Sequence, residues 1–161
     1  MGSGGQAKVT PSGRTNQLLY QAELLLAMPS GEDDQASVRR MALQEGALAL
    51  SELCLESFLR EITEHARLPT HAWRELLAPH GPAVAELGRL RDLLAQPESW
   101  LAWLTQRLEQ LHAEEGAARR PTQNPGMIAV GGSHDLGDAL SDCLAQAKRE
   151  IAALRETSQE W

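Results

Sequence analysis

Apolar residues recur at helical spacing along most of the chain, and the longest such stretch lies near its middle. From Glu32 to Arg67, about 36 residues contain no proline and are apolar on two opposed faces of a helix. One face holds Met41, Leu48, Leu55, Leu59 and Ile62. The opposite face holds Leu43, Ala47, Leu50, Cys54 and Phe58. A helix that is apolar on two sides needs packing partners on both. We therefore expect this segment to be the central helix of an α-helical bundle.

A first principal helix is expected before the central one. Its apolar period begins at Ser12 or Thr15 and continues to Met28. The preceding residues 1–11 are rich in glycine and polar residues, which predicts a disordered tail. Ser30 is the expected N-cap of the central helix, because a serine hydroxyl there can accept from free backbone N–H groups.

The C-terminal half predicts two more principal helices. Pro97 suits the first position of a helix that continues through Leu111, because proline lacks the N–H that this position leaves unbonded. A last helix is expected from about His134 to Ser158, with Ser133 as its N-cap. A short helix that Thr70 can cap is expected to run through Leu77, and another is expected at about Pro82–Ala95.

Residues 116–132 interrupt the helical pattern. The stretch AARRPTQNPGMIAVGG within it contains two prolines and three glycines without a helical period, which predicts a loop. Met127–Val130 is expected to lie extended against the bundle. The sequence thus predicts an all-α fold: one helical-bundle domain over residues 12–161, with four principal helices, short additional helices and a long central second helix.

Composition and charge narrow the expected partners and the compartment. The net charge is −7, and an acidic surface repels phosphate backbones and anionic lipid, so we expect neither nucleic acid nor a membrane as partner. The two cysteines, Cys54 and Cys143, lie in apolar helical patterns far apart, which favours two reduced core thiols. Together with the lack of a signal peptide or a membrane-spanning run, this predicts a cytoplasmic protein.

Metal and cofactor sites find little support in the sequence. A di-iron bundle needs two Glu-x-x-His pairs and two further inward Glu residues, and the chain has one such pair, Glu109 and His112. Neither cysteine has a histidine at the short spacing of a zinc site. Gly131–Ser133 precedes a helix but lacks the lysine of a phosphate-binding loop. We predict no metal, no cofactor and no catalytic residue.

One pair of residues leaves a catalytic alternative open. Arg60 and His65 enclose four residues, a spacing that resembles the Arg-x4-His pair of HEPN-domain ribonucleases, which are helical bundles. In that family the pair activates the ribose hydroxyl and stabilises the transferred phosphate. Arg74/His80 and Arg107/His112 show similar spacings, so the match has little specificity. Ordinary polar residues on helix surfaces are the other explanation.

Two tryptophans three residues apart form another candidate site. Trp100 and Trp103 adjoin on one side of their expected helix, beside Leu101 and Leu104. Packing at the core or at its edge explains them; the alternative is an exposed anchor for a partner, because tryptophan is favoured at interface hot spots. The final residue, Trp161, is expected to dock on a neighbouring helix.

Several landmarks in order resemble a family of small bacterial proteins of about this length that is known only as a domain of unknown function. They are GRTNQLLYQAELLL at Gly13–Leu26, PESWLAWL at Pro97–Leu104, MIAV at Met127–Val130 and the closing Glu160 and Trp161. The resemblance implies an all-helical fold and no known activity, and it brings no catalytic residues. Its polar landmarks are Arg14, Asn16, Gln17 and Tyr20.

The sequence leaves two functional hypotheses. The first is a non-enzymatic helical bundle that binds a protein partner or associates with itself. Its candidate binding residues are Arg14, Asn16, Gln17, Tyr20, Trp100 and Trp103, with the 116–132 loop as a further surface. The second is an HEPN-like ribonuclease that uses Arg60 and His65.

Overall fold

The computed structural model describes residues 8–119 and 135–159, and the regular structure in these two ranges is helical throughout. Its elements are α1 (Pro11–Ala27), α2 (Ala36–Ile62), η2 (Glu64–Ala66), α3 (Trp73–Leu76), α4 (Ala85–Leu94), α5 (Trp100–His112) and α6 (Leu136–Gln159). Four helices of 13 residues or more, α1, α2, α5 and α6, carry the bundle. The predicted all-α fold class is confirmed.

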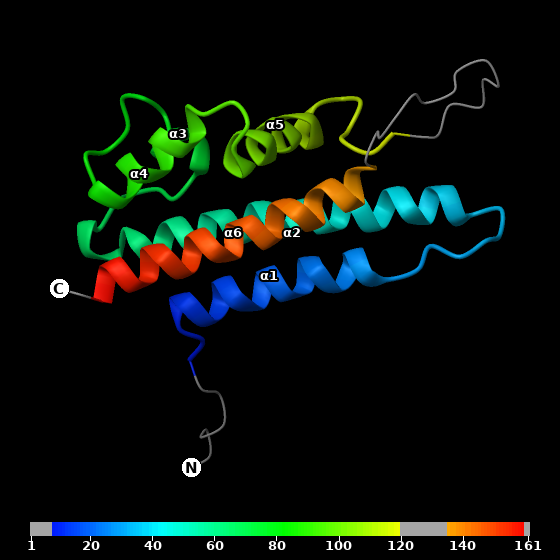
Figure 1. The fold of residues 1–161 in the computed structure, drawn as a ribbon, viewed down its shortest axis with the longest axis horizontal. Helices are drawn as coiled ribbons and strands as arrows, with labels where there is room; N and C mark the ends of the chain where they lie inside the picture. Colours follow the sequence, from blue (N-terminus) through cyan, green and yellow to red (C-terminus); the bar gives the residue numbers. More distant parts are fainter. Residues whose placement is uncertain (1–7, 120–134, 160–161) are drawn as a thin grey trace, which may run out of the picture.

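The long second helix α2 lies at the centre of the bundle, as its two apolar faces predict. It packs against α1, α3, α5 and α6. α1 and α5 lie on opposite sides of the α2–α6 pair (Figure 1). Leu48 and Leu59 from one predicted face are fully buried, and so are Ala47 and Phe58 from the other. Both faces of α2 therefore contribute to one continuous hydrophobic core.

The start of α2 differs from the prediction, because it begins at Ala36 and Ser30 is not its N-cap. Arg39 folds back over the preceding turn, where its Nη1 donates to the carbonyl of Ser30 at 2.5 Å and to Asp33 at 3.2 Å. Asp33 Oδ1 also accepts from the backbone N–H of Gln35 at 3.0 Å. These bonds give residues 30–35 a turn of their own, so the helix starts after it.

α2 also ends earlier than its apolar pattern suggests, at Ile62. Beyond it, the chain tightens into the short η2. Arg67 then adopts the left-handed conformation, with φ of 49°, which stops helical growth before Pro69. The prolines and the apolar period alone do not show this stop.

α1 begins at Pro11, one residue inside the segment predicted to be a disordered tail. Thr10 is its N-cap, and the Thr10 hydroxyl accepts from the N–H of Gly13 at 3.0 Å. Pro11 occupies the first turn, where its missing N–H costs nothing. Residues 1–7 lie outside the described part of the chain.

Three other predicted helix starts are also corrected. α3 starts at Trp73 with Ala72 as its N-cap instead of Thr70, and Glu56 of α2 accepts the backbone N–H of Trp73 at 3.0 Å. α5 starts at Trp100, where the Ser99 hydroxyl accepts from Ala102 N–H at 3.1 Å and replaces Pro97 as the start signal. α4 starts at Ala85, three residues after Pro82.

The predicted 116–132 loop is described only at its beginning. Glu45 of α2 accepts the backbone N–H groups of Ala117 and Ala118 at 2.8 and 3.3 Å, which anchors this segment to the central helix. Gly116 precedes them with a positive φ of 75°. Met127–Val130, Ser133 and Trp161 lie outside the described residues. At the start of α6, Asp135 Oδ1 accepts from Asp138 N–H at 2.8 Å.

Cys54 and Cys143 are buried and not bridged, as the sequence predicts. Burial raises the pKa of each thiol to about 12. Across the two described ranges, no helix has both the length and the apolar character that crossing a bilayer requires.

Candidate functional site

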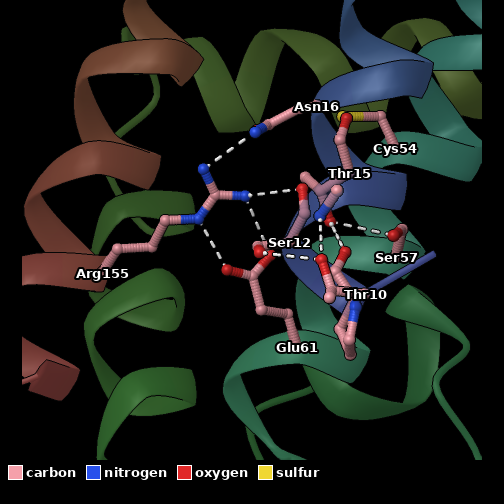
Figure 2. A network of polar contacts seen from close by, with 10 residues as sticks. Thr10, Ser12, Thr15, Asn16, Cys54, Ser57, Glu61 and Arg155 are labelled. Carbon is pink, nitrogen blue, oxygen red and sulfur yellow. Dashed lines mark hydrogen bonds and ion pairs between the residues drawn. The ribbon is translucent and has the colours of Figure 1, made fainter. Parts of the chain in front are cut away.

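Arg155 of α6 hydrogen-bonds to residues of both α1 and α2 (Figure 2). Its Nε and Nη2 donate to the two carboxylate oxygens of Glu61 on α2, at 2.6 and 3.1 Å. Its Nη1 donates to Asn16 Oδ1 on α1 at 2.9 Å, and Nη2 also reaches the carbonyl of Ser12 at 3.3 Å. A planar guanidinium suits this arrangement, since its several donors are fixed in a fork.

A second set of polar contacts lies next to Arg155 and joins α1 to α2 more deeply. Thr15 is fully buried, and its hydroxyl lies 2.9 Å from the hydroxyl of Ser57 and donates to the carbonyl of Pro11 at 3.1 Å. The thiol of Cys54 donates to the Thr15 carbonyl at 3.5 Å. These buried polar groups are all satisfied within the protein, which makes them structural supports.

A groove opens beside Glu61, with a volume of about 1260 Å³. The end of α2, η2, the start of α4 and the last turns of α6 surround it, and these segments meet at one end of the bundle (Figure 1). Small or aliphatic side chains line much of it: Ile62, Ala66, Ala83, Val84, Ala85, Ala153 and Leu154. The charged side chains that line it are Glu61, Glu64, Glu86, Arg89 and Glu150. We call it the carboxylate groove.

Of the α1 residues singled out from the sequence, only Asn16 joins the Arg155 contacts. Arg14 instead donates to Gln17 on its own helix at 2.6 Å, and both are exposed. Tyr20 is 65% exposed, on the side of α1 that faces away from the core. Asn16 is therefore the one of the four with a hydrogen bond to another helix.

The two central tryptophans lie away from α1. Trp100 is 8% exposed and packs in the core, where Cys143 of α6 donates to its backbone carbonyl at 3.6 Å. Trp103 is half-buried, and the guanidinium of Arg107 lies 5.5 Å from its ring centroid, a cation–π distance. The sequence-based candidates therefore do not converge on a single cleft.

Arg60 and His65 are both exposed, but they face different surroundings. His65 lines the carboxylate groove, whereas Arg60 does not. Arg60 instead lies near His71, whose pKa is lowered first by burial and then by the positive charge of Arg60. A groove with four carboxylates repels RNA phosphates, so this geometry gives the ribonuclease alternative no added support.

Among residues 8–119 and 135–159, no group of three or more His, Cys, Asp or Glu side chains is placed to hold a metal ion. The histidine of the Glu109/His112 pair lies 2.8 Å from Glu52 of α2, while Glu109 pairs with Arg74 of α3. The two side chains thus serve separate contacts between helices.

Comparison with protein families adds one finding. The model of a family of unknown function, DUF6586, matches residues 9–161 and so covers nearly the whole chain, including all the helices described above. The chain belongs to the DUF6586 family. No curated protein and no solved structure matches it. The fold and contacts of this DUF6586 chain are therefore the basis for proposing its function.

Glu61 and Arg155 of this DUF6586 chain were not among the candidates identified from the sequence. Arg155 directly follows Leu154, the last position of the apolar stripe on α6, and Glu61 directly precedes Ile62 on α2. Charged residues at the edge of an apolar stripe lie where they can pair across a helix interface. This signal marks many positions, and only the packing of α2 against α6 selects these two.

Proposed function

We propose that this protein is a non-enzymatic, cytoplasmic helical bundle that acts by binding protein, and that its binding surface is the outer side of the α1–α2 hairpin. The observation that supports this proposal is the position of the large apolar side chains that are exposed to solvent. Within the described part of the chain they are Val9, Tyr20, Leu24, Met28, Val38 and Leu53, all on α1, on α2 or next to them. Exposed apolar groups gathered in one region mark interaction sites.

Three of these side chains form a row along α1. Tyr20 and Leu24 lie four residues apart on one side of the helix, and Met28, the C-cap of α1, follows after another four residues. They are 65%, 50% and 50% exposed. The opposite side of α1 holds the buried Leu18 and Ala22, so the row points away from the core.

The charge pattern of α1 favours a second copy of the chain as the binding partner. Arg14 and Glu23 are its only charged residues, and Glu23 pairs with Lys148 of α6 at 2.8 Å. Two molecules that each carry a net charge of −7 repel one another least where they meet through an uncharged surface. A two-fold axis would let the Tyr20–Leu24–Met28 row of one copy pack against the same row of the other.

Light scattering coupled to size-exclusion chromatography tests this proposal over a range of protein concentrations. We expect a concentration-dependent dimer and expect Leu24→Glu to raise its dissociation constant at least about tenfold, because the new carboxylate would be desolvated at the interface. Ala145→Glu is the matched control: it adds the same charge at an exposed position of α6. Circular dichroism verifies that both variants keep their helical content.

A different protein partner would use the same surface. In that case the wild-type protein is monomeric, and a purified partner binds it but not the Leu24→Glu variant. A monomer whose protein contacts are unaffected by Leu24→Glu contradicts the proposal. Incubation with mixed RNA tests the ribonuclease alternative. We expect either no cleavage or cleavage that the His65→Ala variant retains.

The chemistry of the thiols argues against either cysteine as a catalytic nucleophile. Cysteine acts as a nucleophile in its thiolate form, and burial holds the pKa of Cys54 and Cys143 at about 12. Both thiols are therefore protonated at neutral pH. Two reduced, buried thiols also fit the cytoplasm, where disulfides are rare.

A further inference from the structure

The carboxylate groove lies at the opposite end of α2 from its N-terminal turn, and its walls come from segments distant in sequence. Ile62 and Leu154 are buried at its base, on α2 and α6. Four alanines, Ala66, Ala83, Ala85 and Ala153, add little bulk to the walls, which leaves space between the helices. Its volume of about 1260 Å³ exceeds the roughly 300–1,000 Å³ of common small-molecule pockets. It is large enough for several side chains of a peptide.

The groove carries an excess of negative charge. Its lining includes four carboxylates and one guanidinium. Two of the carboxylates have partners, since Glu61 binds Arg155 and Arg89 Nε lies 3.1 Å from Glu150. Glu64 and Glu86 make no ion pair with any residue of the described ranges. Two unpaired carboxylates thus flank an apolar surface.

We propose that the carboxylate groove binds a basic amphipathic peptide segment of another protein. The apolar side chains of such a segment would lie on Ala83, Val84 and Ala153, which are at least partly exposed above the buried base. Its Lys or Arg residues would pair with Glu64 and Glu86. Charge complementarity distinguishes this ligand from an acidic peptide, from RNA and from an anionic membrane, all of which the carboxylates repel. The groove shares no residue with the Tyr20–Leu24–Met28 row, so this proposal does not depend on the proposed function.

The test uses two synthetic helical peptides that differ only in charge. The first peptide has leucine on one face of the helix and lysine on the other. The second has glutamate in place of every lysine. Titration calorimetry with the full-length protein is expected to show binding of the lysine peptide only. Backbone amide NMR shifts are expected to change mainly at residues 61–66, 83–89 and 150–157.

Two pairs of variants separate groove binding from general attraction to an acidic protein. Glu64→Gln with Glu86→Gln should weaken binding by about two- to twenty-fold, the product of two exposed ion pairs. The control, Glu98→Gln with Glu114→Gln, removes the same charge at exposed positions outside the groove. It should change the affinity by less than about two-fold, because salt screens charges that are distant from the ligand.

The second pair tests the shape of the groove. Ala153→Trp fills it from an exposed position of α6, and Ala152→Trp puts the same side chain next to it, outside the groove. We expect Ala153→Trp to abolish binding and Ala152→Trp to preserve it. Equal effects within either pair overturn the proposal. Binding that appears only after removal of residues 160–161 also overturns it and would make the C-terminus of the chain itself the occupant.

Discussion

Arg155 and Glu61 form a two-pronged ion pair that joins the last helix to the central one, with N–O distances of 2.6 and 3.1 Å. The side chains are 25% and 13% exposed, so the pair lies largely out of water. The same guanidinium also binds Asn16 and the Ser12 carbonyl, which brings the start of α1 into the arrangement. Among the side chains of α6 that the structure describes, Arg155 is therefore the one with hydrogen bonds to both α1 and α2.

We predict that Arg155→Ala lowers the free energy of unfolding by about 1–3 kcal/mol, because it leaves Glu61 without its donors in a mostly buried position. Arg155→Lys should recover only part of this loss, since an ammonium group cannot donate in two parallel bonds. Urea denaturation followed by circular dichroism measures both. Arg149→Ala, at an exposed position of the same helix, is the control. A loss no larger than that of the control would show that the pair does not stabilise the fold.

The fold class was predictable because it depends on apolar periodicity, which the sequence displays directly. Leu48 and Phe58 lie on opposite predicted faces of one segment, and both are buried. This pattern alone predicts that α2 has packing partners on two sides. Helix boundaries were harder to predict because they depend on side chains that return from elsewhere. Arg39 hydrogen-bonds to the Ser30 carbonyl in the turn before α2, and Glu56 of α2 accepts the first backbone N–H of α3.

The candidate site was only partly predictable, for a related reason. The polar landmarks of α1 were visible in the sequence, yet Asn16 is the one among them that hydrogen-bonds to another helix, through Arg155. Which surface a residue of α1 occupies depends on where α6 packs, and α6 is separated from α1 by more than 100 residues. Sequence spacing contains no information about that packing. The carboxylate groove was missed because its walls come from three separate segments.

Two glycines in this chain should respond in opposite directions to the same substitution. Gly116 has φ of 75°, and an added Cβ would lie 2.6 Å from Glu45 Oε2, which anchors the next two residues. Gly116→Ala should therefore destabilise the protein by about 1–2 kcal/mol or more. Gly88 lies inside α4, where an added Cβ meets no atom within 4 Å other than those of its chain neighbours and of the backbone of its own helix. Gly88→Ala should stabilise the protein by about 0.5–1 kcal/mol. Thermal unfolding of the two variants measures both changes, and shifts of equal sign would contradict the assigned backbone conformation.

Glu52 connects two helices to α2 through a single carboxylate. One oxygen accepts from the indole N–H of Trp73 at 2.9 Å, and the other lies 2.8 Å from His112 Nε2. Glu52→Ala should cost about 1–3 kcal/mol of unfolding free energy, because the N–H of the buried Trp73 then lacks an acceptor. Glu109→Ala removes a nearby exposed ion pair with Arg74 and should cost less than about 1 kcal/mol. Chemical denaturation ranks the two variants, and the reverse order would refute the role of Glu52.

The buried thiols predict how stability depends on alkaline pH. An unfolded cysteine releases its proton near its ordinary pKa of 9.0, whereas Cys54 and Cys143 in the folded protein hold theirs until about pH 12. Between these values the unfolded state binds fewer protons than the folded state, so raising the pH favours unfolding. Each thiol contributes a loss of up to about 1.4 kcal/mol per pH unit above pH 9. Below pH 9 both states keep the proton, and this contribution to stability is fully present.

Urea denaturation at several pH values between 8 and 10.5 tests this expectation, with the Cys54→Ala/Cys143→Ala double variant as the control. The substitutions lower stability at every pH through lost packing, by an amount that does not depend on proton release. The informative quantity is therefore the slope of unfolding free energy against pH. We expect the wild-type protein to lose stability more steeply than the double variant above pH 9. Parallel slopes would mean that the two thiols are accessible to water, and the packing of α2 against α1 and α6 around them would need revision.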